Sequence, residues 1–124
     1  MVRVIIAGTR NFSDYPLMKD KLDRLRASIG VFEVVSGGAT GADSLGERYA
    51  QENELPLKVF PAEWDKYGKA AGYKRNEQMA QYAGACIVFW DGKSKGTEHM
   101  INLATQYGLK TSIVRYGEEQ SIQD

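Results

Sequence analysis

The sequence is poor in the residues that form covalent or metal cross-links. Among its 124 residues there is one cysteine, Cys86, and one histidine, His99. A single cysteine excludes an internal disulfide, and its place in an apolar run predicts that it packs in the core. The lack of a His/Cys cluster excludes the usual transition-metal sites. We therefore predict no bound metal, and a chain of this length is long enough to form a stable core without cross-links.

The sequence also lacks an excess of charge of either sign. It has 16 basic and 16 acidic side chains, so its formal net charge is zero. A protein that binds nucleic acid or an anionic membrane surface through general electrostatics needs a basic excess to displace counterions. The balance argues against nucleic acid as a partner, although it leaves room for a local basic patch.

Long hydrophobic runs are missing as well. The run at residues 2–7 is too short for a signal peptide or a membrane span. We therefore expect no membrane association and a cytoplasmic location.

Short apolar runs alternate with segments of helical spacing. The runs at residues 2–7, 31–36, 57–60, 85–90 and 111–115 predict strands, and Met18, Leu22, Leu25 and Ile29 mark one helix face. A further helix is predicted over about residues 71–83. Near-continuous apolar strands are typical of a parallel sheet covered on both faces. The pattern predicts one Rossmann-like three-layer α/β domain at residues 1–116, with about five parallel strands and helices on both faces, followed by a polar tail at residues 117–124.

Two glycine-rich segments join a predicted strand to a predicted helix. The first runs from Ser36 to Asp43, and the second from Asp91 to Thr97. Such a turn brings backbone N–H groups together at the positive end of a helix dipole, which suits a phosphate group. The pair predicts a phosphate-binding site at one edge of the sheet.

The other strand ends also carry residues suited to binding. Arg10 follows a Gly-Thr pair, where its guanidinium suits an anion, and Lys69 and Arg75 follow the third strand. Because the carboxyl ends of parallel strands meet at one edge, a single site is expected there. The candidate ligand-binding residues are Gly8, Thr9, Arg10, Ser36, Gly37, Gly38, Thr40, Gly41, Asp43, Trp64, Lys69, Arg75, Asn76, Asp91, Gly92, Ser94, Gly96 and Thr97.

Several of these residues also fit structural roles. Thr40 and Asp43 suit helix caps, and the second loop can be a turn followed by a cap. Trp64 and Trp90 suit packing as well as stacking on a base. His99 has no partner visible in the sequence.

Neither loop has the fingerprint of a common nucleotide cofactor. The pattern Gly-x-Gly-x-x-Gly is missing from both, and the spacing from Gly92 to Gly96 does not fit a Walker motif. We therefore predict no NAD or other cofactor and no ATP hydrolysis.

A set of motifs along nearly the whole chain resembles the YspA, or cpYpsA-related, branch of the SLOG superfamily. The motifs are Gly8-Thr9-Arg10, Ser36-Gly37-Gly38-Ala39-Thr40-Gly41-Ala42-Asp43, Phe60-Pro61-Ala62-x-Trp64, Gly68-Lys69-Ala70-Ala71-Gly72, Arg75-Asn76-x-x-Met79 and Trp90-Asp91-Gly92-x-Ser94-x-Gly96-Thr97. The resemblance implies a Rossmann-like domain that recognises nucleotide-derived ligands, with sensing or processing roles often near phage systems. It also implies self-association.

The sequence departs from the SLOG enzymes at two positions, Asn76 in place of a lysine and Met100 in place of a glutamate. The Lonely Guy phosphoribohydrolases have Arg-Lys-x-x-Met, followed by Pro-Gly-Gly-x-Gly-Thr-x-x-Glu. Here Arg75 and Met79 match the first motif and Thr97 matches the second, but Met100 stands where the glutamate is expected. A methionine can neither stabilise an oxocarbenium-like centre nor activate water.

Three functions remain open at this point. The first is a nucleotide-binding or sensing domain, in which the backbone amides of residues 37–42 and 92–97 hold phosphate, Arg10 and Arg75 neutralise charge, and Trp64 or Trp90 flanks the base. The second is an N-glycoside hydrolase for a nucleoside monophosphate, with Asp43 or Glu98 as the catalytic carboxyl. The third is a DNA-associated module, because the superfamily includes the DprA proteins.

Overall fold

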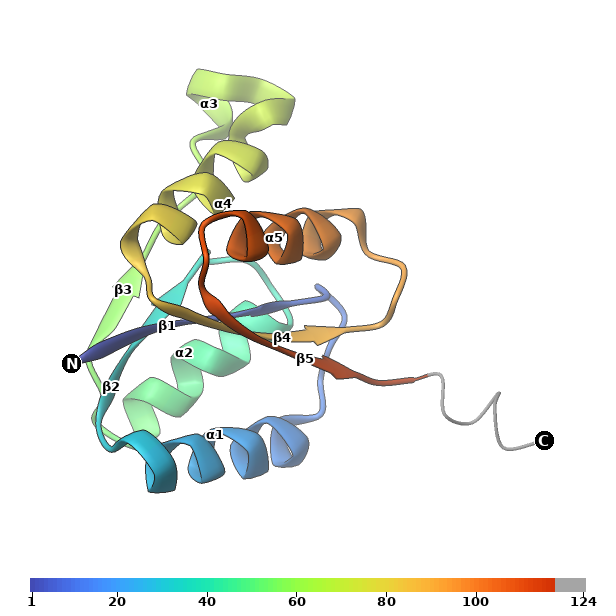
Figure 1. Cartoon of the computed structure of the whole chain (residues 1–124). Coiled ribbons are helices and arrows are strands. Elements are labelled where there is room, and N and C mark those ends of the chain that lie inside the picture. The colour runs from blue at the N-terminus through green and yellow to red at the C-terminus, as the bar shows by residue number, and fades with distance from the viewer. Residues whose placement is uncertain (118–124) are drawn as a thin grey trace.

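Five parallel strands form a single sheet at the centre of the molecule (Figure 1). The computed structural model describes residues 1–117. The strand order is β3-β2-β1-β4-β5, with β1 at Val2–Gly8, β2 at Phe32–Ser36, β3 at Leu57–Val59, β4 at Ala85–Trp90 and β5 at Lys110–Arg115. The five predicted strands are confirmed to within about two residues at each end. The tail predicted from residue 117 onward lies, except for Gly117, outside the described residues.

Helices cover both faces of the sheet, which confirms the predicted three-layer arrangement. Figure 1 shows α1 (Tyr15–Ile29) and α2 (Ala42–Glu52) below the sheet, and α4 (Ala71–Tyr82) and α5 (Lys95–Gln106) above it. Within residues 1–117 no helix is long and apolar enough to cross a membrane.

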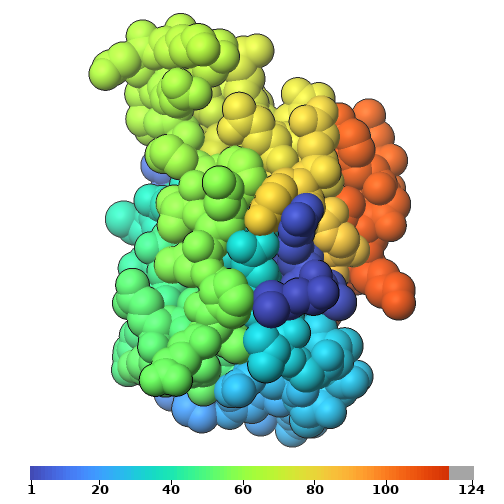
Figure 2. All heavy atoms as spheres, turned by 90° about the vertical axis from the view of Figure 1, so that its left-hand side faces the viewer, coloured from blue at the N-terminus to red at the C-terminus, as the bar shows by residue number. Residues whose placement is uncertain are grey.

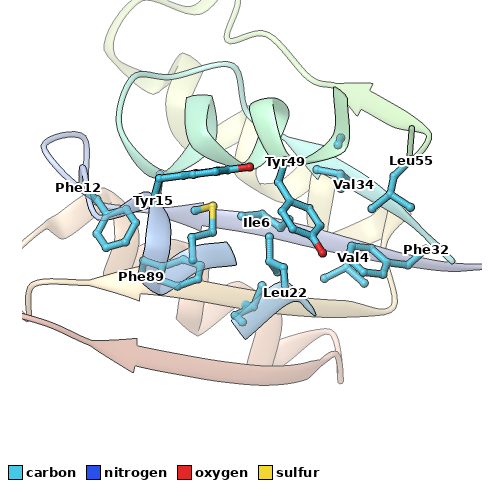
Figure 3. Close-up of a cluster of buried hydrophobic side chains, with 14 residues drawn as sticks. Val4, Ile6, Phe12, Tyr15, Leu22, Phe32, Val34, Tyr49, Leu55 and Phe89 are labelled. Carbon is cyan, nitrogen blue, oxygen red and sulfur yellow. The ribbon is translucent and has the colours of Figure 1, made fainter. Parts of the chain in front are cut away.

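Each central strand sends alternate side chains to the two sides of the sheet. Val4 and Ile6 of β1 join the core between the sheet and helices α1 and α2, where Figure 3 shows Ile6 beside Tyr49. Ile5 and Ala7 join a second core on the other face, between the sheet and helices α4 and α5. Burial on both faces explains the continuous apolar runs of the central strands. The edge strands differ, since β5 leaves Ile113 45% exposed.

Side-chain caps fix the starts of two helices. Asp14 accepts a hydrogen bond from the Leu17 amide at 3.1 Å at the start of α1, and Ser94 accepts one from the Thr97 amide at 3.3 Å at the start of α5. On the predicted face of α1, Met18 and Leu22 are fully buried, whereas Ile29, at the last residue, is 40% exposed. Leu25 is partly buried against the same core, so the α1 face leaves the core only in its last turn.

A short helical segment that the sequence did not predict lies between β3 and α4. It consists of α3 (Trp64–Tyr67) and a 3-10 turn, η1 (Gly68–Ala70), and neither buries a side chain. We call residues 64–75, which comprise these elements and the start of α4, the lobe. Figures 1 and 2 show it projecting beyond the rest of the domain. Its helical spacing carries no apolar stripe, so hydrophobic periodicity could not indicate it.

The strand order reverses between β1 and β4. From β1 the chain passes through α1 to β2 on one side, and from β4 it passes through α5 to β5 on the other. The loops therefore diverge at the carboxyl ends of β1 and β4 and leave a crevice, which is where ligands bind in open α/β sheets.

Candidate functional site

Two adjoining cavities open at this crevice. One, of about 230 Å³, lies between the ends of β1 and β4, the first turn of α5 and α4. The other, of about 390 Å³, lies over the loop after β2 and beside Pro61 and Ala62. Arg10, Ala39, Trp64 and Arg75 line both cavities. The two cavities thus form one cleft, divided by a wall that includes two arginines and an indole.

Internal hydrogen bonds shape the loop after β2. The buried Ser36 hydroxyl accepts from the Gly38 amide at 3.1 Å and donates to Glu47 Oε2 at 2.6 Å. Gly41, at φ 75°, precedes α2, and a Cβ there would lie 2.3 Å from the Arg10 carbonyl oxygen. These contacts fix the loop without bringing Ser36 or Gly41 to the cavity surface.

Asp43 is a buried carboxyl in the wall of the smaller cavity. It lies in the first turn of α2, is 6% exposed, and accepts a hydrogen bond from the Ala39 amide at 3.2 Å. Burial raises the pKa of Asp43 to about 6, although the Ala39 amide and the positive charges of Arg75 and Arg10 partly oppose this rise. This carboxyl therefore changes protonation close to neutral pH, as acid–base groups of active sites do.

Arg75 connects the first glycine loop to α4. Its Nη1 donates to the Gly37 carbonyl oxygen, and its Nε donates to Asn76 Oδ1 at 3.0 Å. A Cβ on residue 37 would lie 2.7 Å from Arg75 Nη1 and 2.9 Å from Asp43 Oδ2, so any larger residue there would displace these side chains. Arg75 is thereby held with its charge at the wall shared by the two cavities.

Asn76 continues this connection to the start of α5. Its Nδ2 donates to the Gly96 carbonyl oxygen at 3.4 Å and lies 3.2 Å from His99 Nδ1. Burial lowers the pKa of His99, which keeps the imidazole neutral and able to accept this hydrogen bond. The Tyr73 ring lies 4.4 Å from the His99 ring, measured between centroids. Sequence reasoning did not predict the contacts of His99 or Tyr73.

The loop after β4 is organised around Asp91. Asp91 Oδ1 accepts from the Lys93 and Ser94 amides at 2.8 and 3.0 Å, and these bonds lower the pKa of Asp91. The Asp91 amide in turn donates to Thr9 Oγ1 at 3.2 Å. With the Thr97 amide bonded to Ser94 Oγ, several amides that we expected to hold phosphate already have partners within the protein.

The structure brings most of the predicted ligand-binding residues to the cleft. Those that line a cavity are Gly8, Arg10, Gly37, Gly38, Thr40, Asp43, Trp64, Lys69, Arg75, Asn76, Ser94, Gly96 and Thr97. Those that do not are Thr9, Ser36, Gly41, Asp91 and Gly92, which shape the loops instead. Glu98 is exposed, lies 3.9 Å from Lys95, and lines neither cavity.

The cleft also contains residues that the sequence did not indicate. Tyr73 stands three residues before Asn76, and this helical spacing is the one signal that could have predicted it. Ala7, a small apolar residue, is the other; the remaining lining residues stand in the motifs compared with the SLOG family but were not predicted to bind ligand, and they are Ala39, Pro61, Ala62, Gly72, Met79 and Met100.

Fold and cleft together define a Rossmann-like α/β domain with its ligand crevice at the strand-order switch. The family model for the YspA, cpYpsA-related SLOG family matches residues 2–67, and the chain belongs to this family. It is similar to the Gene 61 protein of Mycobacterium phage D29, with 38% identity over 127 residues, covering 96% of this chain and 99% of the phage protein. The resemblance seen in the motifs is confirmed.

The fold is also similar to that of DNA processing protein A from Helicobacter pylori, whose structure was solved to explain how that protein binds single-stranded DNA. The TM-score is 0.67 at 21% sequence identity, over 94% of this chain and 66% of that chain. This chain thus spans slightly less than two thirds of its length.

The expectation that nucleic acid is not a partner, which we based on the net charge of zero, is wrong. The Helicobacter protein shares this fold and binds single-stranded DNA. Net charge is a sum over the whole surface, whereas a strand meets only the charges along its path. A total of zero therefore does not exclude nucleic acid here.

Proposed function

We propose that this domain binds a phosphorylated, nucleotide-derived ligand in the cleft at the carboxyl edge of the sheet. The observation that carries the proposal is the wall of two arginines, Arg10 and Arg75, between two adjoining cavities. A guanidinium in a partly buried cleft suits phosphate, because it is always charged and presents several N–H donors in a fixed plane.

The other walls suit the remainder of such a ligand. Trp64 offers a large aromatic surface at the mouth of both cavities, and Met79 and Met100 give the smaller cavity an apolar floor. Charged and polar side chains such as Asp43 and Asn76 line the same cavity beside these apolar groups. Small-molecule sites likewise combine apolar walls with polar groups that fix the orientation of the ligand. Membership of the SLOG family is consistent with a ligand of this class.

Replacing Arg75 with alanine is expected to weaken nucleotide binding by roughly 10- to 100-fold, because a hydrogen bond to a charged group contributes about 1.5–3 kcal/mol. The measurement is a thermal-shift panel of nucleoside mono- and diphosphates and ADP-ribose, followed by calorimetric titration of each ligand that raises the melting temperature.

The matched control is Arg24→Ala, which removes an exposed arginine from α1 on the opposite face of the sheet. It should leave ligand affinity unchanged. A panel without any response, or equal affinities for wild type and Arg75→Ala, would contradict the proposal.

A second candidate function is hydrolysis of the N-glycosidic bond of a nucleoside monophosphate. It is favoured by Asp43, whose carboxyl lines the smaller cavity with a pKa of about 6 and can therefore hold a proton near neutral pH. Met100 lies in the same cavity and supplies no carboxyl.

If this candidate is correct, wild type releases free base from a nucleoside monophosphate, and Asp43→Asn releases it at least about 100-fold more slowly, within the usual range for loss of general acid–base catalysis. Chromatography of the products measures the release. Glu98→Gln is the matched control, because Glu98 lies outside the cavities and its loss should leave the rate unchanged. Absence of base release by wild type would eliminate this candidate.

A further inference from the structure

The lobe at residues 64–75 exposes aromatic side chains where the fold gives them no core to pack against. Trp64 is 51% exposed and Tyr73 is 50% exposed, and α3 and η1 contain no buried residue. Large exposed aromatics that gather in one place commonly mark a binding surface. Figure 2 shows the lobe standing out from the domain, with solvent on several sides.

The lobe is also the place where positive charge collects. Residues 64–75 contain Lys66, Lys69, Lys74 and Arg75 but one acid, Asp65, so the segment carries a net charge of +3 in a chain whose total is zero. The three lysines are exposed. Glu63 precedes the segment and does not cancel this excess.

Tyr67 holds two of these lysines together. Its ring centroid lies 5.1 Å from Lys66 Nζ and 4.9 Å from Lys74 Nζ. Attraction of the ammonium groups to the ring face positions both charges on the same part of the lobe. Two cations placed in this way can contact phosphate groups.

The lobe is continuous with the cleft. Lys69 and Tyr73 line the smaller cavity, and Trp64 lines both, whereas Lys66, Tyr67 and Lys74 lie on the lobe beyond the cavities. A polymer with one nucleotide in the cleft would therefore meet both aromatic and cationic side chains where it leaves the cleft over the lobe.

We propose that the lobe binds single-stranded nucleic acid, one nucleotide of which occupies the cleft; the inference rests on the proposed nucleotide site. Exposed rings beside cations suit a single strand, because unpaired bases can stack on aromatic faces while phosphates contact lysines. A duplex keeps its bases stacked on one another and cannot use these rings.

The test measures fluorescence anisotropy of a labelled twelve-base single strand with the full chain between about 50 and 200 mM salt. Each of Lys66→Gln and Lys74→Gln should reduce the slope of log K against log salt by about 0.7, the value for one phosphate contact on a single strand. Tyr67→Leu should weaken binding by about 5-fold or more, as expected when a stacked base or the positions of the two lysines are lost. DNA and RNA strands of equal length identify the preferred backbone, and a duplex should bind more weakly.

Matched controls come from the other end of the domain. Lys110→Gln at the start of β5 and Tyr107→Leu at the end of α5 remove an exposed lysine and an exposed tyrosine far along the chain from the lobe. Both should bind the strand as wild type does. Circular dichroism of each variant verifies folding.

Mononucleotide binding by the same variants separates the two proposals. The lobe variants should keep wild-type affinity for a mononucleotide, because their residues lie outside the cavities, whereas Arg75→Ala should lose both ligands. Mononucleotide binding without strand binding, or strand binding unaffected by the lobe variants, would overturn the lobe proposal alone. Absence of both would overturn the nucleotide site as well.

Discussion

Asp43→Asn is expected to stabilise the domain at neutral pH by up to about 3 kcal/mol. Burial raises the pKa of Asp43 from 3.8 in the reference state to about 6 in the fold, and each unit of difference corresponds to 1.36 kcal/mol. Asparagine keeps an oxygen that can accept from the Ala39 amide but carries no charge to desolvate. The favourable place of an anion in the first turn of α2 offsets part of this gain.

The sign of the pH dependence follows from proton binding. Between pH 4 and 6 the folded chain retains the Asp43 proton more tightly than the unfolded chain, so wild type loses stability as the pH rises through this window. Below about pH 4 the carboxyl is neutral in both states, and the two proteins should have similar stability. Above about pH 6 the difference should be complete and constant.

Urea denaturation at a series of pH values measures this difference. Asp20→Asn serves as the matched control, because Asp20 is an exposed carboxylate on α1 paired with Arg24, and its loss should change the free energy of unfolding by less than about 0.5 kcal/mol. A lower stability of Asp43→Asn at pH 7 would refute the prediction. A carboxyl that costs stability where it stands is expected at a functional site rather than in a purely structural position.

Gly41→Ala is expected to destabilise the domain by about 3 kcal/mol or more. Gly41 adopts φ 75°, and an added Cβ would meet the Arg10 carbonyl oxygen at 2.3 Å and the Thr9 carbonyl oxygen at 2.5 Å. Backbone atoms cannot move aside without shifting the end of β1 against the start of α2. The penalty therefore combines backbone strain with a steric overlap in the loop that supports the cleft.

Gly30→Ala separates these two contributions. Gly30 follows α1 at φ 81°, but a Cβ there would meet no atom within 4 Å. This variant should lose only the free energy of backbone strain, about 1–3 kcal/mol. Equal losses for the two variants in chemical denaturation would show that contact with the Arg10 loop is not needed to explain glycine at position 41.

The sheet could be predicted from the sequence because its central strands are buried on both faces. Short apolar runs such as residues 85–90, with turn residues on either side, are typical of a buried strand. The lobe could not be predicted in this way, since α3 buries no residue and therefore has no hydrophobic period. Its exposed tryptophan suggested packing as readily as binding.

The sequence predicted where the site lies in the fold but not which of its residues contact one another. The glycine loops and Arg75 could be assigned to one sheet edge, because each follows a predicted strand and the carboxyl ends of parallel strands meet at one edge. The connection from Gly37 through Arg75 and Asn76 to Gly96 joins residues up to 59 positions apart, and it depends on the packing of α4 beside both loops. Local sequence patterns carry no information on such contacts.

Net charge was a poor guide because it averages over regions of opposite sign. The twelve residues of the lobe contain a surplus of three positive charges, which the rest of the chain offsets. A running local sum, taken over each predicted loop, would have indicated this region.

Because the two cavities share a wall, the binding free energy of a ligand in one cavity is expected to depend on whether the other is occupied. Because Arg10, Trp64 and Arg75 face both spaces, a small molecule in one cavity draws on side chains that a molecule in the other would also use. Two separate fragments should therefore compete or cooperate rather than bind independently. A single molecule that spans the wall avoids that coupling and gains from the high effective concentration of its second half. Synthetic ligands for this cleft are best built across the wall, by linking fragments found on either side.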